Sequence, residues 1–202
     1  MVIVDIETTG LDPFENAIIE IGAVDFFNPK NQFYQRCKVR LDAVINSKSL
    51  DVNGYNRDEL FDDACQSENE LINNFINWMK NINKRTLVGQ NVNFDLSFLN
   101  ASIKRFNIEW NFGRRLIDVH TLAYIHMVNL GVNPPLLDSV SSLNGDKIMS
   151  YVGLPEEPKP HTGINGAKFE AEAISRLIYG KGILVEFEKF IIPKIIYNNF
   201  KS

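Results

Sequence analysis

The alternation of hydrophobic and polar positions predicts that the chain begins as a run of strands. Apolar, β-branched residues fill positions 2–4 of the opening M-V-I-V-D-I-E-T-T-G and predict a strand buried on both faces. Residues 17–27 predict a long second strand, and residues 32–41 predict a third beyond a turn at residues 28–31. The chain therefore opens as a β-meander.

Helical spacing dominates the rest of the chain. Ser67 and Glu70 form a predicted capping box, and apolar residues follow at helical intervals as far as Ile82. A meander followed by alternating helices and strands predicts an α/β fold, with a mixed sheet and helices packed on it. Residues 42–63 are predicted to form a loop with one helical turn near residues 57–60. Further helices are expected over residues 93–106, 120–130, 138–152, 167–179 and 185–199, and short buried strands over residues 86–89 and 116–119.

Composition is that of an ordinary globular protein. Of 202 residues, 45% are hydrophobic and 23% are charged, which suits one domain with a substantial core. We expect that domain over residues 1–182, with residues 183–202 forming a C-terminal helix packed on it. Cys37 and Cys65 belong to no metal-binding pattern, so reduced thiols are expected.

Charge and hydropathy narrow the set of partners. The sequence has no basic leader and no apolar run of about 18 residues, so we expect a cytoplasmic protein with no membrane partner. A net charge of -4 argues against a protein that coats nucleic acid through a broad basic surface. It leaves open a protein that holds a short nucleic-acid end through metal ions.

The first strand carries the main candidate for chemistry. Asp5 and Glu7 are two residues apart, so a strand would present both carboxylates on one face. Such a pair is costly without a cation, and hard cations such as Mg²⁺ take carboxylate oxygens together with substrate phosphates. A solvated strand end is the alternative reading. Thr8, Thr9 and Gly10 then form a small polar turn that a ligand could approach closely.

Two further residues stand out by their setting. Asp95 follows a buried strand and lies at the start of a helix, where an acid also has a purely structural role beside the helix dipole. His161 follows a Pro-rich connector, where a loop could carry a base to a site, although a surface histidine is the alternative. His120 and His126 lie on a predicted helix and are interpreted as structural.

These residues carry a family resemblance. The segments D-I-E-T-T-G (5–10) and Q-N-V-N-F-D (90–95), and the region that begins at His161, resemble the three motifs of the DEDDh family of 3′-5′ exonucleases. That family includes the epsilon proofreading subunit of bacterial DNA polymerase III, ribonuclease T and oligoribonuclease. Intermediate signatures agree: V-N-G-Y (52–55), L-I-D (116–118) and G-L-P (153–155). The resemblance implies a ribonuclease-H-like fold with a central five-stranded mixed sheet flanked by helices.

The resemblance also implies a mechanism that uses two divalent metal ions, Mg²⁺ or Mn²⁺, to release nucleoside monophosphates from single-stranded DNA or RNA ends. By this resemblance Asp5, Glu7 and Asp95 would bind metal, and His161 would be the general base. Asp118 matches a family acid whose role stays open. Residues that would contact or shape the terminal nucleotide are Thr8, Thr9, Gly10, Leu11, Asn91, Phe94 and Phe98.

One position departs from the family pattern. Five residues after His161 the family has a metal-binding Asp, whereas this chain has Gly166. Glu170 and Glu172 are not expected to replace it, because they lie further along the predicted helix and start from different faces. The sequence therefore predicts an exonuclease with impaired activity. The alternative is a catalytically inactive module of the same fold that binds nucleic-acid 3′ ends or a DNA polymerase.

Overall fold

A five-stranded mixed sheet lies at the centre of the computed structural model, which describes residues 1–197. Its strand order is β3-β2-β1-β4-β5, and β1 pairs antiparallel with β2 and parallel with β4. The predicted mixed sheet and ribonuclease-H-like architecture are therefore confirmed. The strands are β1 (Val2–Thr8), β2 (Ile18–Asp25), β3 (Gln32–Arg36), β4 (Leu87–Gly89) and β5 (Ile117–Asp118).

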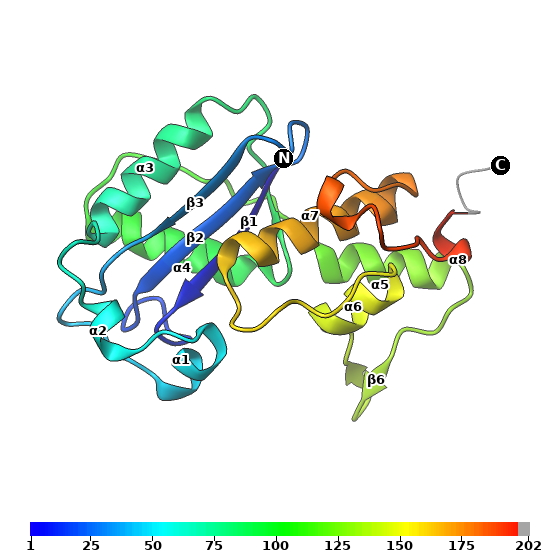
Figure 1. Cartoon of the computed structure of the whole chain (residues 1–202), viewed down its shortest axis with the longest axis horizontal. Coiled ribbons are helices and arrows are strands. Elements are labelled where there is room, and N and C mark those ends of the chain that lie inside the picture. The colour runs from blue at the N-terminus through cyan, green and yellow to red at the C-terminus, as the bar shows by residue number, and fades with distance from the viewer. Residues whose placement is uncertain (198–202) are drawn as a thin grey trace.

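Helices cover both faces of this sheet (Figure 1). Along β1, Val2 and Val4 pack with the helices α3 and α4, while Ile3 between them packs toward α5, α6 and α7. This alternation places Asp5 and Glu7 on the α7 side. The helices are α1 (Ser47–Asn53), α2 (Arg57–Leu60), α3 (Glu68–Lys80), α4 (Val92–Arg105), α5 (Val119–Asn129), α6 (Gly145–Tyr151), α7 (Gly163–Tyr179) and α8 (Lys194–Tyr197), with a 3-10 turn at Val185–Phe187.

Two predicted helices form over only part of their expected length. Within residues 138–152 the helix is confined to α6, and the chain before it is a hairpin of β6 (Leu136–Leu137) and β7 (Val140–Ser141), because Asp138 and Ser139 turn the chain with positive φ. The predicted C-terminal helix over residues 185–199 is broken within the described part, where Pro193 precedes the short α8. Residues 198 and 199 lie outside the described residues.

Two helices begin where the sequence did not predict them. α1 lies in the segment predicted as loop, capped by the Asn46 side chain and ended by Gly54 at φ 75°. α7 begins at Gly163 rather than at residue 167, since the Thr162 side chain accepts a hydrogen bond from the Asn165 backbone N–H. Across residues 1–197, no helix has the length and apolar character needed to span a bilayer.

Candidate active site

The carboxyl end of β1 opens into a pocket of about 350 Å³. Asp5 and Glu7 both line it, as expected for residues two apart on a strand. The opposite wall comes from α7, with Gly166, Phe169 and Glu170. The remaining lining residues are Ile6, Gln90, Asn144, Gly145, Asp146, Met149, Glu157 and His161.

Asp95 is tied to the same strand from the other side. Its carboxylate Oδ1 accepts a hydrogen bond from the backbone N–H of Ile6 at 3.1 Å, and its side chain is only 3% exposed. Asp95 does not line the pocket wall itself. The bond joins the start of α4 to β1 midway between Asp5 and Glu7, so these three predicted site residues lie at one place.

Burial makes the charged forms of these acids unfavourable. Burial, and then the nearby carboxylates of Glu170 and Asp95, raise the pKa of Asp5 well above its usual range. Burial and then Glu20 raise the pKa of Glu7 to about 8, and burial raises the pKa of Asp95 to about 8. A bound cation would stabilise the charged forms of these buried neighbouring acids, so the cluster is a candidate cation site.

His161 lies on the pocket wall beside an acid that the sequence reasoning missed. The imidazole Nδ1 is 3.7 Å from Glu157 Oε2, and the other oxygen of Glu157 is buried without a hydrogen-bond partner. Burial raises the pKa of Glu157 to about 7. Nothing in the connector P-E-E-P-K-P distinguishes Glu157 from the exposed Glu156, so only the fold could reveal it.

The start of α7 is held against the sheet by a buried acid on β2. Glu20 Oε1 accepts the backbone N–H of Gly163 at 2.6 Å, and Glu20 Oε2 accepts the hydroxyls of Tyr34 and Tyr55 at 3.0 and 2.5 Å. A Cβ on Gly22 would overlap the backbone of Gly163, so the two backbones touch with no side chain between them. A Cβ on Gly163 would likewise come within 2.6 Å of the Asp5 carbonyl oxygen, so the helix begins in close backbone contact with both β1 and β2.

A second pocket, also of about 350 Å³, adjoins the first, and Ile6 and Glu7 line both. Thr8, Leu11 and Phe94, which the resemblance links to the terminal nucleotide, line this second pocket. The other lining residues are Asn46, Lys48, Ser49, Val52 and Asn53.

The remaining predicted nucleotide contacts are not on this wall. Thr9 is fully buried, and its hydroxyl donates to the Val44 carbonyl at 2.7 Å. Phe98 is buried beneath Phe94, with 4.9 Å between the ring centroids. Gly10 packs against the Asn16 side chain, and Asn91 is exposed at the start of α4 with φ 56°. The fold thus uses the side chains of Thr9 and Phe98 internally, and their expected roles at the terminal nucleotide stay a prediction.

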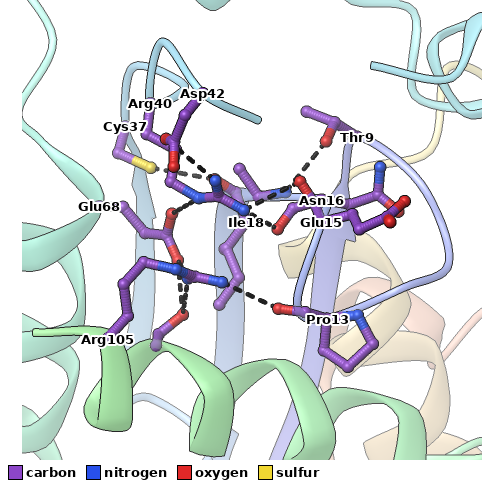
Figure 2. Close-up of polar contacts among 12 residues, drawn as sticks. Thr9, Pro13, Glu15, Asn16, Ile18, Cys37, Arg40, Asp42, Glu68 and Arg105 are labelled. Atoms are coloured by element: carbon purple, nitrogen blue, oxygen red, sulfur yellow. Dashed lines mark hydrogen bonds and ion pairs between the residues drawn. The ribbon is translucent and has the colours of Figure 1, made fainter. Parts of the chain in front are cut away.

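Figure 2 shows how the turn after β1 is fixed, with Glu68 between Arg40 and Arg105. Arg105 Nη1 lies 2.9 Å from Glu68 Oε1, and Arg105 Nη2 donates to the Pro13 carbonyl at 2.9 Å. Arg40 donates to the carbonyls of residues 15 and 16 at 2.9 and 2.8 Å. The turn that carries Leu11 is thus anchored to α3 and α4.

The fourth family position lies inside the site but carries no side chain. Gly166 faces Asp5, and a Cβ at 166 would overlap Asp5 Oδ2 and come within 2.8 Å of Cγ. Glu170, one helical turn later, also faces the pocket, so the expectation that it starts from a different face is wrong.

Glu172 instead bonds Arg176 at 2.9 Å and two backbone N–H groups, away from the site. Asp118 caps α5 by accepting the Thr121 N–H.

The donor set fits hard divalent cations. All the candidate ligands are carboxylate oxygens, which Mg²⁺ and Mn²⁺ prefer, and one of them, Glu170 Oε2, is buried without a partner. Among residues 1–197, no group of three or more His, Cys, Asp or Glu side chains converges closely enough to hold a metal ion. Side-chain rearrangement would therefore have to accompany binding.

Comparison with known proteins identifies the class. The family model RNase_T, described as exonuclease, matches residues 2–174. The chain belongs to this exonuclease family, as the resemblance of its motifs to exonuclease motifs predicted. Family membership supports a nuclease function on nucleic-acid ends.

Sequence relatives include much longer proteins. The PolC-type DNA polymerase III of Thermotoga petrophila is 27% identical over 178 residues, which are 88% of this chain and 12% of the polymerase. The Thermotoga maritima protein of the same description gives the same identity and coverage. The chain thus spans only 12% of the length of these curated relatives.

Solved structures of low sequence identity share the fold. Cell-death related nuclease 4 has a TM-score of 0.70 at 19% identity, over 90% of this chain and 64% of that one. The nuclease domain of 3′hExo, a DEDDh family member bound to rAMP, has a TM-score of 0.68 at 16% identity, over 95% of this chain and 94% of that one. Escherichia coli exonuclease I with a dA16 oligonucleotide has a TM-score of 0.67 at 16% identity, over 98% of this chain and 42% of that one. At these identities the likeness concerns the fold.

Proposed function

We propose that this chain is a metal-dependent 3′-5′ exonuclease that releases nucleoside monophosphates from single-stranded DNA or RNA. The observation that carries the proposal is the pocket at the end of β1. Asp5, Glu7 and His161 line this one pocket, and Asp95 lies directly behind β1. Membership of the exonuclease family supports the same reaction class.

The chain's own residues divide the work. Asp5 and Glu7 would hold two divalent ions, which supply a nucleophilic water at neutral pH and charge stabilisation at the leaving oxygen. Asp95 fixes the strand through the Ile6 N–H and, with cations bound, would add negative charge behind Asp5. His161 takes the proton from the attacking water, and Glu157 at 3.7 Å orients the imidazole for that transfer.

The second pocket suits the terminal nucleotide. Phe94 offers an aromatic face for stacking a base, which is worth about 1 to 3 kcal/mol in other single-strand binders. Leu11 is 77% exposed at the other side, and Lys48 is a cation for a phosphate. Because Glu7 lines both pockets, a nucleotide seated here would have its phosphodiester next to the acids.

Gly166 leaves the family's fourth carboxylate position empty, so we expect a lower rate than a site with four acids at the family positions would give. The alternative function is an inactive module that binds 3′ ends or a polymerase. The likeness to PolC-type polymerases makes a DNA polymerase a candidate partner and proofreading a candidate role.

A cleavage assay tests the proposal. A single-stranded oligonucleotide labelled at its 5′ end should be shortened stepwise from the 3′ end with Mg²⁺ or Mn²⁺ and should stay intact with EDTA. Asp5→Asn should lower the rate by at least 10²-fold. Asp63→Asn, a matched change at an exposed acid remote from the pocket, should leave it unchanged. Metal-dependent binding of the oligonucleotide without cleavage would favour the inactive module instead.

A further inference from the structure

Glu170 lies one helical turn after Gly166 on α7. Residues four apart share a helix face, and helical side chains lean toward the N-terminus of their helix. The carboxylate of residue 170 is therefore carried back over the turn that contains Gly166. Residues 166 and 170 accordingly line the same wall of the pocket.

The Glu170 carboxylate is held on one side and unsatisfied on the other. Oε1 accepts the backbone N–H of Gln90 at 3.0 Å, just beyond the carboxyl end of β4. Oε2 is buried without a hydrogen-bond partner, in a residue only 6% exposed that lines the pocket with Asp5. A buried carboxylate oxygen without a partner is costly, so its position indicates a ligand that the protein itself does not supply.

Gly166 makes room for this arrangement. Asp5 Oδ2 occupies the space where a Cβ at position 166 would lie. An Asp at position 166 and the present position of Asp5 therefore exclude one another, whereas Glu170 and the present Asp5 coexist. By contrast, Glu172 is satisfied by Arg176 and by the backbone N–H groups of residues 183 and 184.

We propose that Glu170 supplies the fourth metal-binding carboxylate of this site, displaced by one helical turn from the Gly166 position. The inference rests on the proposed function of the pocket. Gly166 then does not reduce the number of acids at the metal site. The site keeps four acids and a working metal affinity, with altered geometry.

The competing explanation is that Glu170 only ties the β4–α4 turn through the Gln90 N–H. Glu170→Gln separates the two, because an amide oxygen still accepts that N–H but the negative charge is lost. The variant should melt within a few degrees of the parent in EDTA.

Mn²⁺ binding, measured by calorimetry and by the EPR signal of free Mn²⁺, is the direct test. Loss of outer-shell partners alone typically costs about 10- to 100-fold in metal affinity, so Glu170→Gln should weaken Mn²⁺ binding by more than tenfold. Asp5→Asn should do the same. Glu186→Gln, at an exposed glutamate paired only with Lys168, should bind Mn²⁺ as the parent does.

Relocating the carboxylate provides the second test. In the double variant Gly166→Asp with Glu170→Gln, the acid returns to position 166, and Asp5 must rotate to admit it. Mn²⁺ affinity should recover to within tenfold of the parent. Absence of recovery in the folded double variant would mean that position 170 acts through the fold, and would overturn the inference.

The outcomes also separate this inference from the proposed function. Parent-like Mn²⁺ affinity in Glu170→Gln, together with its loss in Asp5→Asn, refutes the role of Glu170 and leaves the metal-dependent nuclease standing. Failure of the parent protein to bind Mn²⁺ at all removes the proposed function first, and the role of Glu170 with it.

Discussion

Gly22→Ala tests whether the close approach of α7 to the sheet creates the active site. The added methyl group would overlap the backbone of Gly163 and Ile164, whereas an ordinary contact needs 3.4 Å or more. Because backbone cannot rotate away as a side chain can, the start of α7 must withdraw by more than about 1 Å. His161, Gly166 and Glu170 would withdraw with it.

The expected effects on stability and on rate differ in size. Overpacking of this kind typically costs about 1 to 3 kcal/mol, which a domain of this size can survive. A displacement of about 1 Å in a catalytic constellation can cost about 10²-fold in rate. Thermal melting and the 5′-labelled cleavage assay, run on the same preparations, measure both quantities.

A matched control separates position from stability. Ile72 is fully buried on α3, on the face of the sheet away from the pocket, and Ile72→Val should cost about 0.5 to 1.5 kcal/mol without moving α7. That variant should keep a parent-like rate below its melting temperature. A Gly22→Ala protein that cleaves at the parent rate would show that the α7 contact does not position the site.

Three further expectations follow from the pocket. The metal-free protein should melt at a lower temperature at pH 8.5 than at pH 5.5. The pKa values of Glu7 and Asp95 are about 8 in the folded protein, so unfolding releases protons between about pH 4 and pH 8. The free energy of unfolding therefore falls as the pH rises through this range. Each kcal/mol lost is worth about 2 to 4 °C, and a flat melting profile in EDTA would contradict the buried cluster. His161→Ala should lower turnover by about 10²-fold or more with Mn²⁺ affinity unchanged, and equal turnover would return His161 to the role of a surface histidine. Linear single-stranded DNA should compete for binding better than a circle of the same sequence, because the Phe94 pocket encloses an end; equal competition would indicate a strand-coating module.

Much of the sheet was predictable because local patterns and tertiary packing agree there. β1 opens with an apolar run at residues 2–4, and β2 is apolar apart from Glu20 and Asp25, as buried central strands require. The capping box of Ser67 and Glu70 likewise forms as predicted, with both reciprocal bonds present. Prediction failed where the backbone conformation opposes the predicted helix, as at Asp138 and Ser139, which turn the chain with positive φ.

The site was only partly predictable for a different reason. Asp5 and Glu7 share a strand, so their geometry follows from a period of two. The positions of Glu157 and Glu170 depend on how a connector and a helix pack against β1, which no short segment encodes. Their relation to the pocket appears only when distant segments meet, although the four-residue spacing of Gly166 and Glu170 was a signal available in the sequence.

The end of β1 should bind divalent metal through Asp5 and Glu7. Anomalous diffraction from crystals grown with Mn²⁺ and a nucleoside 5′-monophosphate measures this directly. We expect a Mn²⁺ peak about 2.1 Å from carboxylate oxygens of both residues, with the nucleotide phosphate as a further ligand. Mn²⁺ bound elsewhere, or a nucleotide seated with no metal at Asp5 and Glu7, would contradict it.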